Sequence, residues 1–190
     1  MLNPLPSGKG FLLLYKFIIM SNPPLSTSEY HSYYQPYIDK ASVDGLAEGL
    51  QNGLRETSSF FNGIPVEKHS FRYEEGKWTP KEILLHIIDT ERVFTYRALQ
   101  FARSEGAVLK GFDQDEFAKN GDTTGRTMQD LLAEFEAVRM STIHFAKSCS
   151  PASLVRMGEA SGHPLSVRAA LYITIGHEMH HCDIVQERYL

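Results

Sequence analysis

The sequence predicts an all-α fold, a four-helix bundle in a single domain. Four segments of about 20 residues carry apolar side chains at the spacing of amphipathic helices, and polar loops separate them. No segment shows a convincing alternation of apolar and polar residues, which would predict a half-buried strand. The 190 residues are enough to bury a substantial core without disulfides or structural metal.

The first helix is expected from about Val43 to Phe61, with Ser42 as its N-cap residue. Each glycine inside a helix lowers its propensity by about 1 kcal/mol relative to alanine. Three glycines nevertheless lie beside the apolar stripe at four-residue spacing: Gly45, Gly49 and Gly53. We therefore expect a neighbouring backbone to pack closely against this face.

The second helix is predicted by the segment "WTPKE". Thr79 is the expected N-cap residue, Pro80 takes the first helical position, and Glu82 completes a capping box three residues after the cap. The helical pattern of apolar residues then continues to about Phe101. The next segment, residues 111–126, is rich in Asp, Gly and Thr and predicts a loop with one short turn.

The third and fourth helices also have start signals. The third is expected after Thr127, a cap candidate with Asp130 at the third helical position, and it stops before Pro151. A second loop, with Gly and Pro, leads to Ser166 as the last cap. The fourth helix is expected from about residue 167 to residue 188.

Three histidines are the candidate metal ligands. His177 and His181 lie four residues apart on the fourth helix, so both side chains point along its apolar stripe, about 40° apart. His86 lies on the apolar stripe of the second helix. Buried imidazoles need partners, because an unpaired buried polar group costs about 1–3 kcal/mol. A divalent metal would satisfy all three and keep coordination positions open; the alternative is a purely structural histidine cluster.

The letters HEMHH at residues 177–181 match the HExxH pattern of zinc proteases, in which the glutamate is the general base. Such enzymes usually take their third ligand from downstream of the motif. Only nine residues follow His181 here, and none of them is histidine. We therefore disfavour a metalloprotease and expect the third ligand upstream, at His86. His180 is turned about 60° from His177 and is expected at the pocket wall, outside the ligand set.

Charge and cysteine content limit the expected partners and location. The formal net charge of −4 argues against broad electrostatic binding to nucleic acid. The two cysteines have no CxxC spacing, so we expect no disulfide framework and a reducing cytoplasm. The apolar run at residues 9–20 is too short to span a membrane, and no membrane partner is expected. Residues 1–19 are expected to be an appendage outside the fold, from an upstream start codon or a leader.

A family resemblance rests on three segments: "WTPKEILLHIIDTER", "FEAVRMSTIHF" and "IGHEMHHCDIVQ". With the order and spacing of the helices, they resemble the DinB-like superfamily of the DinB/YfiT type, over about residues 26–188. The resemblance implies a four-helix bundle with one divalent metal ion, and His86, His177 and His181 match its three ligand positions. The implied metal is zinc or nickel, with iron or manganese as alternatives, because three histidines alone do not select one metal.

The resemblance also implies an enzyme that acts on a small molecule, with two reaction types open. Characterised relatives include transferases that use bacillithiol, mycothiol or glutathione. There the metal would lower the pKa of the thiol, and the thiolate would attack an electrophilic substrate. We favour this transfer reaction. Other members are described as metal-dependent hydrolases, in which Glu178 or Asp89 would take a proton from water at the metal. A non-catalytic metal-binding or self-associating bundle is the alternative of another class.

Two further features concern the substrate and self-association. Arg139 falls on the apolar stripe of the third helix, where its guanidinium would either bind an anionic group of the substrate or form an ion pair between helices. Dimerisation is common in bundles of this type, and the glycine-lined face of the first helix would permit a homodimer.

Overall fold

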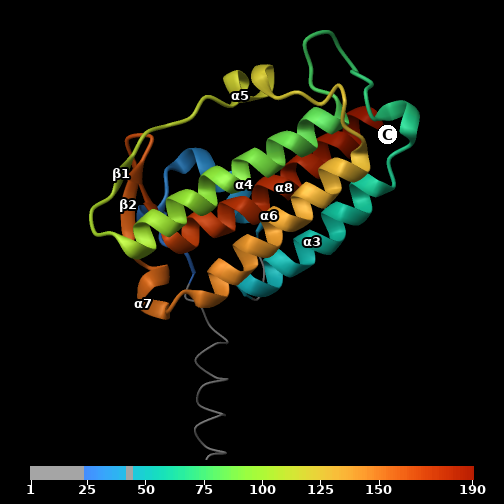
Figure 1. Ribbon diagram of the computed structural model, residues 1–190. Helices are drawn as coiled ribbons and strands as arrows, with labels where there is room; N and C mark the ends of the chain where they lie inside the picture. The colour runs from blue at the N-terminus through green and yellow to red at the C-terminus, as the bar shows by residue number, and fades with distance from the viewer. Residues whose placement is uncertain (1–23, 42–44) are drawn as a thin grey trace, which may run out of the picture.

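The structure is a computed structural model that describes residues 24–41 and 45–190, and its centre is a bundle of four long helices (Figure 1). Helix α3 contacts α6 and α8, and α4 contacts the same two helices, so the four form a closed ring. Their bounds are Leu46–Asn62 for α3, Pro80–Arg103 for α4, Met128–Ser148 for α6 and Val167–Tyr189 for α8. The predicted all-α four-helix bundle is confirmed.

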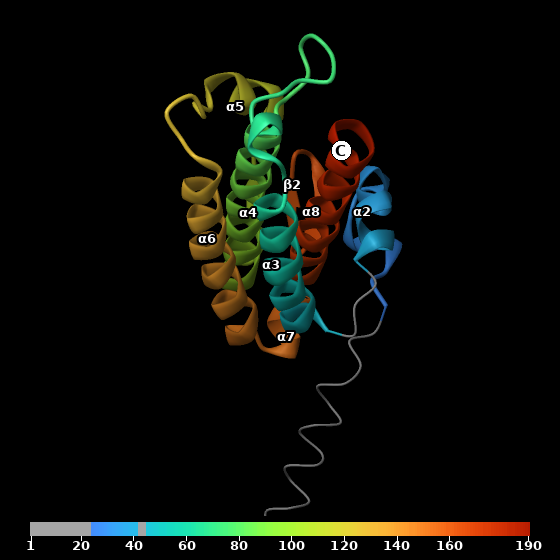
Figure 2. The ribbon, with the colours of Figure 1, turned by 90° about the vertical axis from the view of Figure 1, so that its right-hand side faces the viewer.

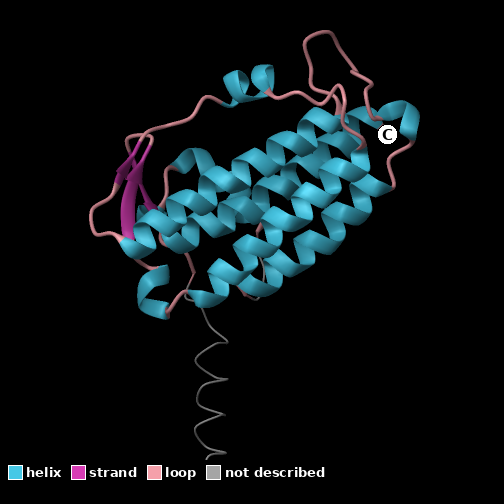
Figure 3. Cartoon of the chain, viewed as in Figure 1, coloured by secondary structure: helices cyan, strands magenta, loops and turns pink. Residues whose placement is uncertain are grey.

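The direction of the helices explains a long connection. The colours in Figure 1 show that α4 and α6 run the same way, while α3 and α8 run the opposite way. The chain must therefore return along the whole bundle between α4 and α6. This crossover segment, residues 104–127, contains β1 (Val108–Leu109) and α5 (Gln114–Asn120) and lies along the outside of α4 (Figure 3).

The caps predicted at Thr79, Thr127 and Ser166 are present. Thr79 and Glu82 form the expected capping box, with Glu82 N donating to Thr79 Oγ1 at 3.2 Å and Thr79 N donating to Glu82 Oε2 at 2.7 Å. Thr127 and Asp130 form a second capping box at the start of α6. At the start of α8, the Ser166 hydroxyl accepts from Ala169 N. The capping residues at these three positions thus determine where each helix begins.

The cap at α4 gives a first testable prediction. The variant Thr79→Ala is expected to lower the free energy of unfolding by about 1 kcal/mol, because one backbone N–H of the first turn loses its acceptor. Urea denaturation followed by circular dichroism measures the change. Ser141→Ala removes an exposed hydroxyl inside α6 and serves as control, with a change within about 0.5 kcal/mol. Equal effects of the two variants would contradict the role of the cap.

The start of the first helix differs from the prediction. Ser42 and Val43 lie outside the described residues, and the described helix α3 begins at Leu46. Its N-cap residue is Gly45, whose backbone is extended with φ −172° and which forms no side-chain cap. An N-cap residue has non-helical backbone angles, and glycine is tolerated there nearly as well as serine. Gly45 therefore lies at the boundary of the helix and has no place in its packed face.

The expectation of no strands is wrong for a small sheet at one end of the bundle. Strands β2 (Met157–Ala160) and β3 (His163–Ser166) form an antiparallel hairpin, and β1 adds to β2 in parallel. Both residues of the connecting turn have positive φ, 56° at Ser161 and 78° at Gly162, as a two-residue type I′ turn requires. Strands of two to four residues are too short to show an alternating pattern, which is why periodicity missed them.

The remaining short elements close the ends and one side of the bundle. Helix α2 packs against α8 (Figure 2). At that contact a Cβ on Gly176 would lie 1.8 Å from the carbonyl oxygen of Tyr37, so only glycine fits there. The ion pair of Glu29 with Arg168, 2.7 Å from Nε to Oε2, anchors the N-terminal turns to the start of α8. The bounds of these elements are Thr27–Glu29, Ser32–Tyr34, Gln35–Lys40 (α2), Val66–Lys68 and Pro151–Leu154 (α7).

Two apolar clusters fill the bundle, one toward each end. One includes Leu50, Phe94, Ile143 and Ile173, and the other includes Phe61, Ile87, Phe135 and Val185. Between the two clusters, α4 carries the buried Glu91, α6 the buried Arg139, and α8 the buried His177, Glu178 and His181. Among the described residues, no helix is long and apolar enough to cross a membrane.

Candidate metal centre

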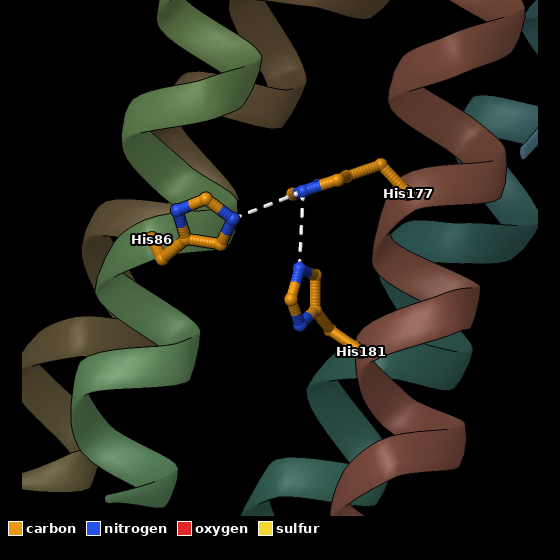
Figure 4. A group of neighbouring side chains, drawn as sticks. All are labelled: His86, His177 and His181. Atoms are coloured by element: carbon orange, nitrogen blue, oxygen red, sulfur yellow. Dashed lines mark hydrogen bonds between the residues drawn. The ribbon is translucent and has the colours of Figure 1, made fainter. Parts of the chain in front are cut away.

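The three predicted histidines meet inside the bundle (Figure 4). His86 comes from α4, and His177 and His181 stand one turn apart on α8. The Nε2 atom of His177 lies 3.0 Å from Nε2 of His86 and 3.1 Å from Nε2 of His181. One ligand atom of each residue therefore lies within 4.8 Å of the others, which is close enough for all three to hold one metal ion.

The histidines are buried and electrically neutral. Their side chains are 6 to 9% exposed. Burial lowers the pKa of His86 to about 4. Burial, and then the neighbouring imidazoles, hold the pKa values of His177 and His181 well below the usual value. A neutral imidazole offers one nitrogen lone pair, and with the ring proton on Nδ1 all three Nε2 lone pairs can be directed at one cation. The donor set therefore fits a divalent metal ion.

Aromatic rings enclose the histidines. The ring of Trp78 lies 4.8 Å from that of His86, and the ring of Tyr37 lies 5.4 Å from that of His177, centre to centre. Trp78 is placed by the cap at Thr79, the next residue. Tyr37 is placed by the close contact of α2 with α8. The ring of His180 also lies 5.4 Å from that of Tyr37, centre to centre, and His180 is outside the group of three ligand candidates.

A cavity of about 200 Å³ reaches His177 from the side of α2 and the crossover segment. His177 forms part of its lining, and Tyr37 and Phe94 form two of its walls. A much smaller space, of about 10 Å³, lies between α4 and the crossover segment beside His86 and Asp89. Burial raises the pKa of Asp89, although Arg92 Nη1 donates to Asp89 Oδ1 at 3.2 Å and opposes that shift.

Glu178 points away from the histidines. It follows His177 directly, which turns it about 100° around α8. Its carboxylate accepts from Arg139 Nη1 at 2.9 Å and from Arg139 Nη2 at 2.7 Å. It lines a separate cavity of about 420 Å³ between α3 and α8, together with Cys182, whose pKa burial raises to about 12. The glutamate of the HExxH pattern therefore forms an ion pair on another face of α8 than the one that carries the histidines.

Arg139 binds two carboxylates at once. Its Nε and Nη2 donate to the two oxygens of Glu91, each at 2.8 Å, and its Nη1 also donates to the Leu50 carbonyl at 3.2 Å. Burial opposes the charge of Arg139, but Glu178 and Glu91 together raise its pKa above the usual value. We call Arg139, Glu91 and Glu178 the Arg139 cluster. Its members are at most 1% exposed, and it joins all four long helices.

The structure thus places the candidate site residues from the sequence in two groups, one around the three histidines and one around Arg139. His86, His177 and His181 come together, and Asp89 shares a small space with His86. Arg139 forms the ion pair between helices, which was one of its two predicted roles. Its partner Glu91 was missed. The available signal was its position among the buried apolar residues of α4, where a single charge requires an opposite charge on a neighbouring helix.

Gly53 of α3 contacts side chains, and the expected close contact with a neighbouring backbone is wrong there. A Cβ at this position would lie 1.9 Å from Glu178 Oε1 and 2.8 Å from Arg139 Nη1. The glycine therefore makes room for the Arg139 cluster. Gly53 is buried, and the homodimer proposed for this face of α3 stays a prediction.

The contact at Gly53 predicts an effect on stability. The variant Gly53→Ala would gain about 1 kcal/mol in helix propensity but forces the Arg139 cluster to move. We expect a net loss of about 1–3 kcal/mol in the free energy of unfolding, measured by urea denaturation. Gly125→Ala is the control, because a Cβ there meets no atom within 4 Å. A stabilised Gly53→Ala variant would contradict the packing.

Comparisons with known proteins agree with this architecture. The family model of the DinB superfamily matches residues 50–185. A protein of Geobacillus kaustophilus named "Putative metal-dependent hydrolase GK0616" is 27% identical over 137 residues, which cover 70% of this chain and 74% of that protein. A "Putative metal-dependent hydrolase" of Geobacillus thermodenitrificans is 24% identical, over 83% of this chain and 88% of its own length.

A solved structure shows the same fold. YfiT from Bacillus subtilis superimposes with a TM-score of 0.64 over 88% of this chain and 90% of its own, at 14% sequence identity. It is described as "a probable metal-dependent hydrolase with an unusual four-helix bundle topology". At this identity the likeness establishes the shared architecture of the two chains.

Proposed function

Since the chain belongs to the DinB superfamily, we propose that it is an enzyme that depends on a divalent metal and acts on a small molecule. The supporting observation is the convergence of three neutral Nε2 atoms from two helices, within 4.8 Å of one another. His86, His177 and His181 would hold the metal. The cavity of about 200 Å³ that His177 lines gives a substrate access to it.

We propose thiol transfer as the reaction. A metal at this site supplies Lewis acidity, which lowers the pKa of a thiol or a water molecule that reaches it. A thiol needs no further base once its pKa falls below neutral, whereas activation of water gains from a nearby carboxylate. Glu178 is committed to Arg139, and this favours the thiol. The walls formed by Tyr37 and Phe94 would orient an apolar electrophile beside the thiolate.

Hydrolysis is the second candidate, and two observations favour it. The relatives from Geobacillus are named as metal-dependent hydrolases. Asp89 lies with His86 at a small space of about 10 Å³, about the size of one water molecule, and burial raises its pKa. In this reaction Asp89 would take the proton of the attacking water.

The test begins with the metal content of purified protein and of His86→Ala and His181→Ala variants. Wild type with one equivalent of metal, lost in both variants, is the expected result. Loaded and metal-free proteins are then given low-molecular-weight thiols with monochlorobimane. Metal-dependent turnover supports transfer, and metal-dependent cleavage of esters or amides without thiol turnover supports hydrolysis. Inertness in both assays would support a non-catalytic metal-binding bundle, and metal retained by both variants would contradict the site.

A further inference from the structure

Arg97 is a buried cation in the same cavity as His177. Its residue is 2% exposed, and it lies on α4. Its Nη2 donates to Ser161 Oγ at 3.1 Å, and its guanidinium lies over the rings of Phe94 and Phe112, 4.9 and 5.6 Å from their centres. No carboxylate within the described ranges, 24–41 and 45–190, forms an ion pair with Arg97.

Two other buried arginines have the carboxylate partners that Arg97 lacks. Arg139 has two carboxylate partners, and Arg168 has Glu29. A buried charge is costly unless it is paired, and one side-chain hydroxyl with two aromatic faces compensates only part of that cost. An arginine also carries five N–H donors, of which Ser161 accepts one. Arg97 therefore has both charge and donors left for an anionic ligand.

Thr90 provides an independent observation in the same cavity. Its residue is 3% exposed and contributes to the lining. In the described part of the chain its Oγ1 is a buried side-chain oxygen without a hydrogen-bond partner. A buried hydroxyl without a partner is uncommon in a native protein and calls for a group that completes its hydrogen bond. A polar atom of a bound ligand would do so.

The two polar residues are aligned with the metal ligands. At 100° per residue, Thr90 and Arg97 lie within about 40° of His86 around the axis of α4. Arg97 is eleven residues from His86, or about 16 Å along that axis. Thr90 lies between them. The lining of the cavity thus includes a cation, a hydroxyl without a partner, and one of the three histidines, His177.

Ser161 holds the guanidinium in place. Its positive φ of 56° belongs to the turn between β2 and β3, and the Ser161 N–H donates to the Leu109 carbonyl at 3.1 Å. The hydroxyl that accepts from Arg97 is thus fixed by the small sheet. A guanidinium held by one side keeps its planar fork directed at a ligand, and a carboxylate matches that fork with two parallel hydrogen bonds.

We propose that this cavity binds a small molecule that carries a carboxylate group, which Arg97 holds while Thr90 contacts a polar atom of the same molecule. The aromatic walls formed by Tyr34 and Phe94 cover the apolar body of that molecule, and its other end faces the histidines. The orientation toward the histidines rests on the proposed function. The carboxylate subsite rests on Arg97 and Thr90 alone.

The test measures binding to metal-free protein. Phenylacetate, 3-phenylpropionate and 4-phenylbutyrate are titrated by calorimetry beside their uncharged amides. At least one carboxylate is expected to bind about tenfold more tightly than its amide, because the charge-assisted pair is lost in the amide. Arg97→Gln is expected to remove that preference. Arg103→Gln, an exposed change at the end of the same helix, is the matched control and keeps it.

Thr90→Val keeps the test decisive if Arg97→Gln does not fold. Without ligand, loss of the unpartnered hydroxyl is expected to raise Tm by about 2–4 °C. The affinity for the preferred carboxylate is expected to fall about fivefold. A residue with only a structural role would not move stability and affinity in opposite directions. Unchanged affinity in this variant, or equal binding of every carboxylate and its amide by wild type, would overturn the proposal.

The variant His181→Ala separates this proposal from the proposed function. It is expected to lose metal but to keep carboxylate binding, since Arg97 and Thr90 are unchanged. If wild type binds metal but shows no preference for carboxylates, the subsite is contradicted and the metal centre is not. If wild type binds no metal but shows a preference for carboxylates that depends on Arg97, the metal centre is contradicted and the subsite is not.

Discussion

The variant Arg139→Met is expected to lower the free energy of unfolding by about 3–5 kcal/mol. It leaves Glu91 and Glu178 fully buried without a counter-charge. Burial already raises the pKa of Glu178 in the wild type, and without the opposing guanidinium this pKa rises further above the unfolded value, so the folded state binds more protons than the unfolded state. Stability contributed by the protonated carboxyls is present below the unfolded pKa and is lost as pH rises. The variant is therefore expected to be more stable at pH 5 than at pH 8.

Urea denaturation at the two pH values measures this effect. Arg92→Met is the matched control on α4, because its pairs with Asp89 and Glu134 are partly exposed and contribute at most about 1 kcal/mol. If Arg139→Met does not fold, the triple variant Arg139→Met, Glu91→Leu, Glu178→Leu tests whether the unpaired carboxylates are the cause. Removal of all three charges is expected to restore folding, since apolar groups of similar volume often replace a buried ion cluster. A loss below 1 kcal/mol in Arg139→Met would contradict the role of the cluster.

The variant His177→Ala is expected to reduce the affinity for a divalent metal by about 100-fold or more. Loss of a residue that only supports a ligand already costs about 10- to 100-fold, so loss of the ligand itself should cost at least as much. His177 has the largest effect of the three histidines, because its Nε2 lies between those of His86 and His181. Competition with a chromophoric chelator measures the affinity, and elemental analysis gives the stoichiometry.

His180→Ala is the control for this experiment. It removes an imidazole from the same turn of α8, and its ring contacts Tyr37 and His181 at the wall of the site. Metal affinity within about threefold of wild type is expected. If both variants lose metal alike, the α8 helix and not its ligand atoms would be responsible, and the assignment of His177 would fail.

Much of the fold follows from local sequence. Thr79 with Glu82 and Thr127 with Asp130 act within one helical turn, so the letters alone place the starts of α4 and α6. The pairing of His177 with His181 is equally local. His86 is 91 residues from His177, yet it was found because an imidazole on an apolar helical stripe must face the core, where the other two also point.

Contacts that depend on how the helices are arranged could not be predicted from the sequence. The ion pair of Glu178 could not be predicted from the sequence, because the ring order of α3, α6, α4 and α8 is what puts Arg139 opposite it. The hairpin of β2 and β3 depends on pairing across a two-residue turn and on contact with β1, and its four-residue strands leave no periodic signal. The position of Tyr37 against His177 depends on how α2 docks at Gly176, which no local pattern encodes.

The shared direction of α4 and α6 divides the molecule into parts with different freedom to vary. The return segment, residues 104–127, is required by that topology, and it supplies Phe112 and Gln114 to the cavity. The proposed metal ligands stand instead on helices that the core holds rigidly. The return segment thus supplies part of the cavity wall and none of the proposed metal ligands, whereas Arg97 and Thr90 share α4 with His86. Substitutions at Phe112 or Gln114 would therefore change the wall of the cavity without altering a proposed metal ligand.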